Sequence, residues 1–178
     1  MTTPSTRVAI RAASTVDAEA IAELHLASWQ AAYRGIVSDE FLDGITLESR
    51  VVRWRRALSP SESPLTETIV AMDGETVVGV CSSGPRRHPD ADGVGEVYSL
   101  HVETASWRRG IGKLLLDDTL QRLAVRGFTG AVLWVLRDNW NARQFYEAQG
   151  WQGTGEEMVE DRSGYAIPES RYAITLAP

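Results

Sequence analysis

The chain has 178 residues, of which 43% are hydrophobic and 24% are charged, and its formal net charge is −6. This length and balance predict a single domain over residues 1–178, with an ordered core over about residues 7–176. The negative charge argues against general nucleic-acid binding. No run of about 18 apolar residues is present, so we expect no transmembrane helix and no membrane partner.

The cysteine and histidine content favours a reducing compartment and no metal site. Cys81 is the only cysteine, so no intrachain disulfide is expected, and its apolar surroundings indicate a core residue. The first six residues lack a hydrophobic signal segment, which favours the cytoplasm. The three histidines are scattered without metal-ligand spacing, so we expect no metal.

The N-terminal half predicts helices that precede a hairpin. Ser14 and Asp17 fit a capping box, Gly35 ends the helix that follows, and Asp73-Gly74 is a hairpin signal. The predicted elements are a strand at 8–11, a helix from the capping box to about residue 33, helices at 39–42 and 47–58, and strands at 68–72 and 76–82.

The C-terminal half alternates strands and helices and ends in a strand pair. Residues 84–95 contain several Gly, Pro and Asp residues, which predicts a mobile loop. Gly127 and Gly150 are stop signals for two helices. The predicted elements are a central strand at 96–102, a helix at 110–126, an apolar strand at 131–136, a helix at 139–149, and antiparallel strands at 151–159 and 170–176.

The most informative stretch runs from Trp107 to Lys113, with glycines at 110 and 112, and leads directly into an apolar helix pattern. Glycines let a ligand approach the backbone closely, and the unpaired N–H groups at a helix start attract anions. Arg108, Arg109 and Lys113 add positive charge, so the loop predicts a phosphate or pyrophosphate site. The spacing excludes a Walker A loop and a dinucleotide fingerprint. The plainer interpretation is a strand-to-helix turn with solvated arginines.

A second pattern lies in the helix predicted at 139–149. Ala142, Phe145, Tyr146 and Gln149 have the spacing of one helix face, and Asn139 lies about two turns before Tyr146. On its own, this pattern is also that of an ordinary amphipathic helix with an aromatic core pair.

Together, these segments resemble the GNAT superfamily of acyl-CoA-dependent N-acyltransferases. The resemblance rests on Arg-Gly-Ile-Gly at 109–112, on Asn-x-x-Ala-x-x-Phe-Tyr-x-x-x-Gly-Trp at 139–151, and on the strand before the loop. It is strongest over about residues 68–160. Trp107 departs from the pattern, because the family often has Gln or Arg three residues before the first glycine. The resemblance implies an α+β domain with a mixed, mostly antiparallel central sheet, helices on both faces, and splayed central strands.

The resemblance further implies an N-acetyltransferase that moves an acetyl group from acetyl-CoA to a primary amine by direct attack. It places the pantetheine against the main chain near Leu100 and Val102, with the Leu100 N–H as oxyanion donor. Tyr146 takes the position of the general acid for the CoA thiolate. Asn139 takes that of a pantetheine contact, or is simply a helix cap. The implied acetyl-CoA contacts are Leu100, His101, Val102, Arg108, Arg109, Gly110, Ile111, Gly112, Lys113, Asn139 and Tyr146.

The base is expected on the central strand, where family members often place a carboxylate that acts through water. Glu96 takes that role, and its plainer interpretation is a solvated strand carboxylate. Strand alternation directs Glu96, Tyr98 and Leu100 to one face and His101 to the other, unless a bulge intervenes. His101 is expected to be a packed side chain.

Trp29, Tyr33 and Tyr98 are the expected acceptor contacts. An aromatic pair at Trp29 and Tyr33 can hold a cation or can simply be core. The acceptor is a small-molecule or peptide amine, with polyamines, amino sugars, amino acids and protein N-termini all open, and a homodimer is also left open. The rival hypotheses are a non-catalytic acetyl-CoA-binding sensor and a ligand-free adaptor. CoA binding and thiol release separate the three.

Overall fold

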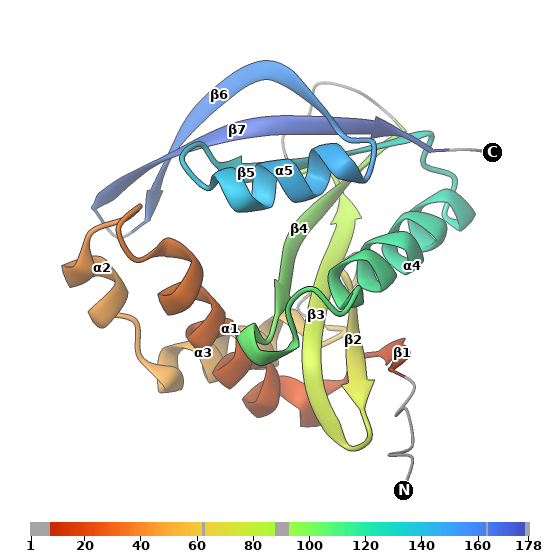
Figure 1. Ribbon diagram of the computed structural model, residues 1–178. Helices are drawn as coiled ribbons and strands as arrows, with labels where there is room; N and C mark the ends of the chain where they lie inside the picture. Colours follow the sequence, from red (N-terminus) through yellow and green to blue (C-terminus); the bar gives the residue numbers. More distant parts are fainter. Residues whose placement is uncertain (1–7, 62, 88–92, 163, 177–178) are drawn as a thin grey trace, which may run out of the picture.

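The computed structural model describes residues 8–61, 63–87, 93–162 and 164–176, and Figure 1 shows their arrangement. Within these residues, the strands are β1 (Ala9–Ala12), β2 (Glu67–Asp73), β3 (Thr76–Pro85), β4 (Val94–Val102), β5 (Gly130–Leu136), β6 (Gln152–Arg162) and β7 (Tyr165–Thr175). The helices are α1 (Ala18–Tyr33), α2 (Asp39–Asp43), α3 (Leu47–Ala57), α4 (Ile111–Val125) and α5 (Trp140–Ala148), with short 3₁₀ turns at Thr15–Asp17 and Thr104–Ser106.

The seven strands form one sheet in the order β1-β2-β3-β4-β5-β7-β6. All neighbouring pairs are antiparallel except β4 and β5. This parallel pair is short, since it joins only residues 94–97 of β4 to residues 130–133 of β5. Both strands continue beyond it, and Figure 1 shows β5–β7 turning away from β1–β4. The predicted α+β fold with splayed central strands is therefore confirmed.

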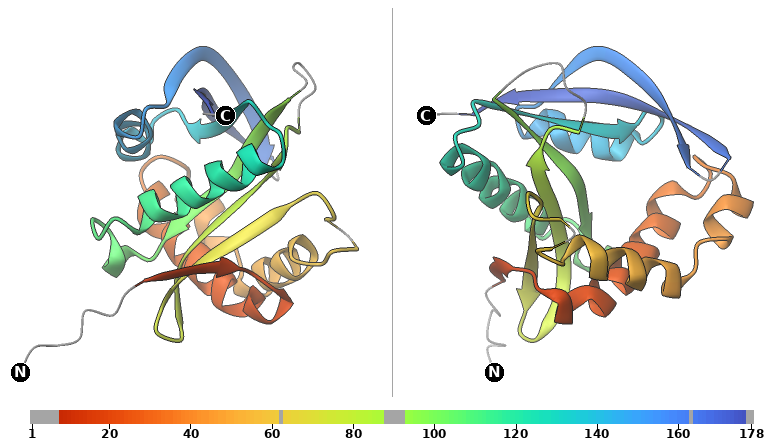
Figure 2. Two further views of the ribbon diagram at one scale, coloured as in Figure 1. Left: turned by 90° about the vertical axis from the view of Figure 1, so that its right-hand side faces the viewer. Right: turned by 180° about the vertical axis from the view of Figure 1, so that it is seen from behind.

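Helices cover both faces of the sheet (Figure 2). On one face, α1 and α3 bury Ile21 and Trp54 against Val70 and Val80. On the other face, the apolar side of α4 packs into the main core, where Leu115 is fully buried. Alternate residues of β2 and β3 therefore serve two separate cores, as the strand period of two requires.

The first helix begins as the sequence predicts. The backbone N–H of Ser14 donates to the Asp17 carboxylate at 2.8 Å, which is half of a capping box. The Arg11 guanidinium on β1 donates to both oxygens of the same carboxylate, at 2.9 and 2.7 Å. Asp17 thus joins the first strand to the first helix.

Two strand boundaries differ from the prediction. Residues 84–85 and 94–95 belong to β3 and β4, so the loop predicted at 84–95 is shorter, and residues 88–92 lie outside the described residues. Pairing between the strands continues to Pro85 and Gly95 despite their weak strand preference. The last two strands also extend further toward each other, because they form one long hairpin. No helix of the described residues is long and apolar enough to cross a membrane.

We predict that Asp17 makes stability depend on pH. The Arg11 hydrogen bonds lower the pKa of the Asp17 carboxyl to about 2. A depressed pKa adds stability above the ordinary pKa of about 4, and this stability is lost as pH falls through the folded value. D17N should therefore unfold at lower denaturant concentration than the wild type at pH 7, and the gap should close as pH falls from about 4 toward 2. E19Q, at an exposed position on α1, is the control. A gap that stays constant across this range would contradict the assignment.

Candidate functional site

The site begins where β4 and β5 separate. Beyond Val97, β4 pairs with β3 up to Val102, but in the described chain it has no strand partner on the β5 side. Main-chain groups of residues 98–102 on that side are therefore available to a ligand, except the Val102 carbonyl, which accepts from the Trp107 indole N–H at 2.8 Å. Unpaired main-chain groups in a partly buried position require partners. The gap thus offers a ligand main-chain donors and acceptors of the kind that a neighbouring strand would use.

A β-bulge at Tyr98 sets the side-chain directions along β4. The register with β3 pairs Ser82 with Ser99 and Ser83 with Val97, which leaves Tyr98 without an opposite residue. After the bulge, Leu100 packs in the same core as Val97, three residues before it. The expectation that Glu96 and Leu100 share a face is therefore wrong, because the extra residue reverses the alternation.

His101 consequently lies on the face covered by α1 rather than opposite Glu96. Its Nδ1 is 3.0 Å from the Ser28 hydroxyl, which itself donates to the His25 carbonyl at 3.0 Å. Since the Ser28 proton is used, His101 Nδ1 carries the hydrogen in this bond. Burial, together with the Arg50 charge, lowers the pKa of His101 to about 3, so the ring is neutral. The expectation of a packed side chain holds, and the imidazole Nε2 keeps its lone pair.

Glu96 is buried rather than solvated, with no exposed surface. Its neighbours Gly95 and Val97 face the α4 core, so its side chain points to the opposite face. The Arg87 main-chain N–H donates to Oε2 at 2.9 Å, and the Arg87 guanidinium donates to Oε1 at 2.8 and 2.5 Å. The carboxylate is thus held firmly, and only its remaining lone pairs can receive a proton.

Tyr98 and Glu96 both contact Arg87, so the two side chains remain close to each other. The Arg87 guanidinium carbon lies 4.8 Å from the centre of the Tyr98 ring. The Tyr98 hydroxyl donates to the Pro85 carbonyl, and burial raises the pKa of the phenol to about 12. Tyr98 therefore contributes a neutral ring whose hydroxyl is already engaged.

Tyr146 lies at the inner end of the gap, on α5. Its ring packs at 5.3 Å from Phe145 and 6.1 Å from Trp151. Its hydroxyl has no hydrogen-bond partner among the described residues, and burial raises its pKa above the ordinary value. Cys81 on β3 and Tyr33 on α1 also contribute to the raised pKa of this hydroxyl. A neutral phenol with a free proton thus stands between the two faces of the sheet.

Asn139 is a helix cap in this structure. Its Oδ1 accepts from the Ala142 N–H at 3.2 Å, at the start of α5. The side chain is buried, and its Nδ2 has no hydrogen-bond partner among the described residues. The cap fixes the start of α5 and thereby the direction of Tyr146 two turns later.

The loop before α4 has the backbone of an anion cradle. Arg108 and Gly110 both have positive φ, 61° and 80°, and Gly110 is the residue before the first helical turn. Successive N–H groups in such a turn point into one concavity at the positive end of the helix dipole. Gly112 also allows close packing of α4 on α5, because a Cβ there would lie 3.3 Å from the Phe145 ring.

The basic side chains of this loop differ in how firmly acidic partners hold them. Arg109 is tied to Asp73 of the β2–β3 turn at 2.9 Å. Lys113 pairs with Asp117 one turn along α4, at 2.6 Å, and both of these side chains are about half exposed. Exposed pairs of this kind are weak. Arg109 is also half exposed, but its partner Asp73 is only 23% exposed, so we expect Lys113 to turn toward a phosphate more easily than Arg109.

Trp29 and Tyr33 lie on the α1 side of the gap. Their rings are in edge contact at 4.7 Å, and burial raises the pKa of Tyr33 to about 12. They pack with Leu136 at the end of β5 and with Ile167 of β7. A small cavity opens beside them, between residues 36–38, the end of β5 and residues 165–168. Both aromatic residues therefore belong to the core that joins α1 to β5 and β7.

The structure adds polar partners that the sequence did not reveal. Arg87 binds Glu96, Ser28 and His25 hold His101, and two further arginines, Arg50 and Arg162, flank Trp29. Their positions depend on pairing between segments far apart in the chain. The only sequence signal was the arginine-rich composition of the helix at 47–58.

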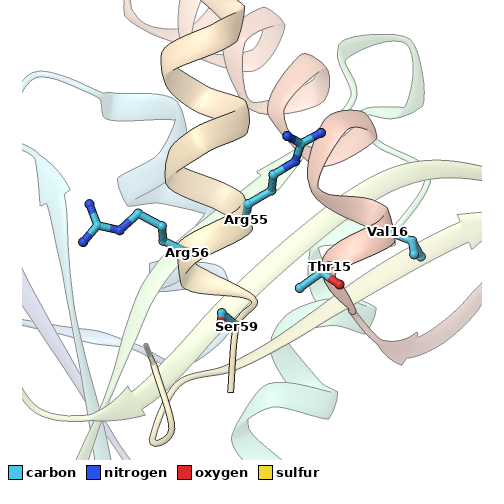
Figure 3. Close-up of a pocket in the computed structure, with 5 residues that line it drawn as sticks. All are labelled: Thr15, Val16, Arg55, Arg56 and Ser59. Carbon is cyan, nitrogen blue, oxygen red and sulfur yellow. The ribbon is translucent and has the colours of Figure 1, made fainter. Parts of the chain in front are cut away.

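A surface hollow lies apart from this site. Figure 3 shows it between the start of α1 and the end of α3, lined by Thr15, Val16, Arg55, Arg56 and Ser59. None of these residues belongs to β4, β5 or the loop before α4.

Comparison with known proteins identifies the fold and the family. The model of the acetyltransferase (GNAT) family matches residues 19–151, three quarters of the chain. The chain belongs to this family, and it is an acyltransferase. The predicted resemblance is confirmed.

Relatives and solved structures agree with this result. The chain is 27% identical over 154 residues to the uncharacterized N-acetyltransferase YuaI of Bacillus subtilis, covering 86% of this chain and 85% of YuaI. It has the fold of the PaiA N-acetyltransferase of Thermoplasma acidophilum in complex with coenzyme A (TM-score 0.71, 22% identity, 92% and 98% of the two chains). It also has the fold of yncA, a putative acetyltransferase from Salmonella typhimurium, with its cofactor acetyl-CoA (TM-score 0.70, 18% identity, 97% and 95%).

Proposed function

We propose that the protein transfers the acetyl group of acetyl-CoA to a primary amine of a small molecule or peptide by direct attack. The observation that carries this proposal is the separation of β4 from β5 beside Tyr146. This separation leaves a slot lined by main-chain groups that have no strand partner within the described residues. Tyr146, the proton donor, lies at its inner end, and the anion cradle before α4 lies at its outer end.

The residues present fit acetyl-CoA. At the outer end, no atom lies within 4 Å of the place where a Gly110 Cβ would be, so the cradle is open to a pyrophosphate. The main chain of Leu100, His101 and Val102, apart from the Val102 carbonyl bound by Trp107, would pair with the pantetheine amides as a strand would. Arg108, Ile111, Gly112 and Lys113 complete the phosphate contacts in this proposal.

The reaction needs an oxyanion donor and an acid. The amine nitrogen attacks the thioester carbon, and the negative charge on the carbonyl oxygen is met by the Leu100 N–H. When the C–S bond breaks, the thiolate takes its proton from Tyr146. The raised pKa keeps this phenol protonated until charge collects on sulfur.

The amine must lose a proton before or during the attack. Glu96 takes it through water in this proposal, and Arg87 holds the carboxylate in place for that relay. Trp29, Tyr33 and Tyr98 line the way to the gap on the acceptor side.

The deciding experiment combines calorimetry with CoA and acetyl-CoA and a thiol-release assay over a panel of amines. We expect binding of both ligands and amine-dependent release of free CoA. Binding without release for every amine would favour a non-catalytic acetyl-CoA sensor. No binding would contradict the site itself.

Lys113 and Arg109 give a matched test of the cradle. K113A should weaken CoA binding in calorimetry and reduce its salt dependence, because an exposed lysine is available to a phosphate. R109A should have a smaller effect on CoA affinity, since Asp73 holds its guanidinium. Equal losses, or a larger loss for R109A, would contradict this division of roles.

Tyr146→Phe removes the proton donor and keeps the packed ring. We expect unchanged CoA affinity and a kcat lower by about 10²- to 10⁴-fold, the usual loss for a general acid. A change confined to KM would make Tyr146 a positioning residue, and full activity would exclude it as the acid.

Glu96→Gln tests the base with two acceptors of different amine pKa. The kcat/KM of the wild type should rise with pH on a limb that includes both the enzyme base and the amine. Glu96→Gln should lose the part of this pH dependence that does not change with the acceptor, because that part belongs to the enzyme base. Wild-type rates and profiles with both acceptors would exclude Glu96 as the base.

A further inference from the structure

Four arginines gather on the acceptor side of the gap, and together with Trp29 we call them the arginine cluster. Arg50 and Arg53 come from α3, Arg87 follows β3, and Arg162 ends β6. The guanidinium carbons of Arg50 and Arg162 lie 5.1 and 5.0 Å from the centre of the Trp29 ring. Segments distant in sequence thus bring positive charge to one place.

The carboxylates in this region are already paired. Glu96 is bound by Arg87, while Glu160 and Glu169 are both bound by Arg162, the latter at 3.0 Å. Arg50 and Arg53 have no carboxylate within salt-bridge distance among the described residues. Two of the four guanidinium groups, Arg50 and Arg53, are thus without a carboxylate partner in the described chain, and the four arginines exceed the three carboxylates by one charge.

Two donors in the cluster have no acceptor. Trp29 Nε1 and Arg50 Nε are both buried, and neither has a hydrogen-bond partner among the described residues. Burying a donor without a partner costs free energy, so such groups call for an explanation. An anionic oxygen bound between the two side chains would satisfy both at once.

The electrostatics agree with a site for an anion. Burial and the charges of Arg53 and Arg162 lower the pKa of Arg50 to about 10. The same three arginines help to lower the pKa values of the neighbouring His25 and His101. Each charged guanidinium is destabilised by the positive potential of the other two. A bound anion would reduce this repulsion.

The cluster is close to the reacting end of the gap and apart from the cradle. Trp29 contacts Tyr33 at 4.7 Å, and Tyr33 is an electrostatic neighbour of the Tyr146 hydroxyl. The cluster lies on the α1 and α3 face, whereas the cradle belongs to α4 on the other face (Figure 2). An anion bound here would therefore belong to the acceptor and not to the CoA phosphates.

We propose that the acceptor is an amine whose own molecule carries an anionic oxygen group, in the simplest case a carboxylate, and that Arg50 and Trp29 Nε1 bind this group. The proposal rests on the proposed function. Polyamines and other multiply cationic amines are poor acceptors on this account, because the excess positive charge of the cluster repels them.

The first test compares acceptors that differ only in this group. Thiol release is measured for amino acids, their carboxamides, and aminoalkyl phosphonates of the same length, with rates expressed per concentration of neutral amine. We expect kcat/KM to be higher for the anionic amines than for the carboxamides. The phosphonate arm shows whether the site accepts a carboxylate only or oxyanions in general.

Arg50→Ala should lower kcat/KM for the anionic acceptors by about 10- to 100-fold, as loss of a charged hydrogen bond does, mainly through KM. It should leave the carboxamides nearly unchanged. Arg55→Ala, an exposed arginine on the same helix that lines the hollow of Figure 3, is the control and should change neither. Equal use of both acceptor kinds, or an equal loss for both in Arg50→Ala, would overturn the proposal.

A binding measurement separates this proposal from the proposed function. N-acetylglycine and N-acetylglycinamide, which resemble the two kinds of product, are titrated into the CoA complex and followed by calorimetry. We expect tighter binding of N-acetylglycine, and loss of that preference in Arg50→Ala. Equal binding would overturn the anion site even in an active enzyme. Preferential binding without thiol release from any amine would overturn the proposed function alone.

Discussion

The parting of β4 from β5 is the constraint on which the rest of the structure depends. A sheet normally satisfies its main chain through its neighbours, but here four residues of parallel pairing are followed by divergence. The bulge at Tyr98 redirects β4 at that point, and the β5–β7 unit turns away with its own hairpin. The structure thus keeps open a slot that a peptide-like ligand arm can fill with strand-type hydrogen bonds.

The two faces of the sheet beside the slot carry different chemical groups. On the α4 face, the start of the helix and a glycine at a positive φ form the turn that we propose as the phosphate site. On the α1 and α3 face, the polar side chains are neutral histidines, a buried carboxylate paired with the half-exposed Arg87, and the arginine cluster. Tyr146 is the side chain placed between them. Two substrates can therefore approach one point from opposite sides of a single sheet.

Local signals in the sequence predicted much of this arrangement. The helix before Gly35, the turn at Asp73-Gly74, the glycine turn before α4 and the cap at Asn139 depend on neighbouring residues, and the structure has each of these local features. The bulge at Tyr98 depends on the register with β3, a contact between distant segments. The faces of the sheet to which Leu100 and His101 point were therefore predicted wrongly. Arg87 on Glu96 and Arg50 on Trp29 are contacts between distant segments, which periodicity and spacing do not contain.

The central claim is that acetyl-CoA takes the place of a strand beside β4. Amide hydrogen exchange of residues 98–102, measured by NMR with and without acetyl-CoA, tests it most directly. We expect ligand-dependent slowing at those N–H groups that point toward β5, with amides already paired to β3 changed much less. Binding that leaves every amide of this segment unchanged would contradict the claim and would place the ligand elsewhere.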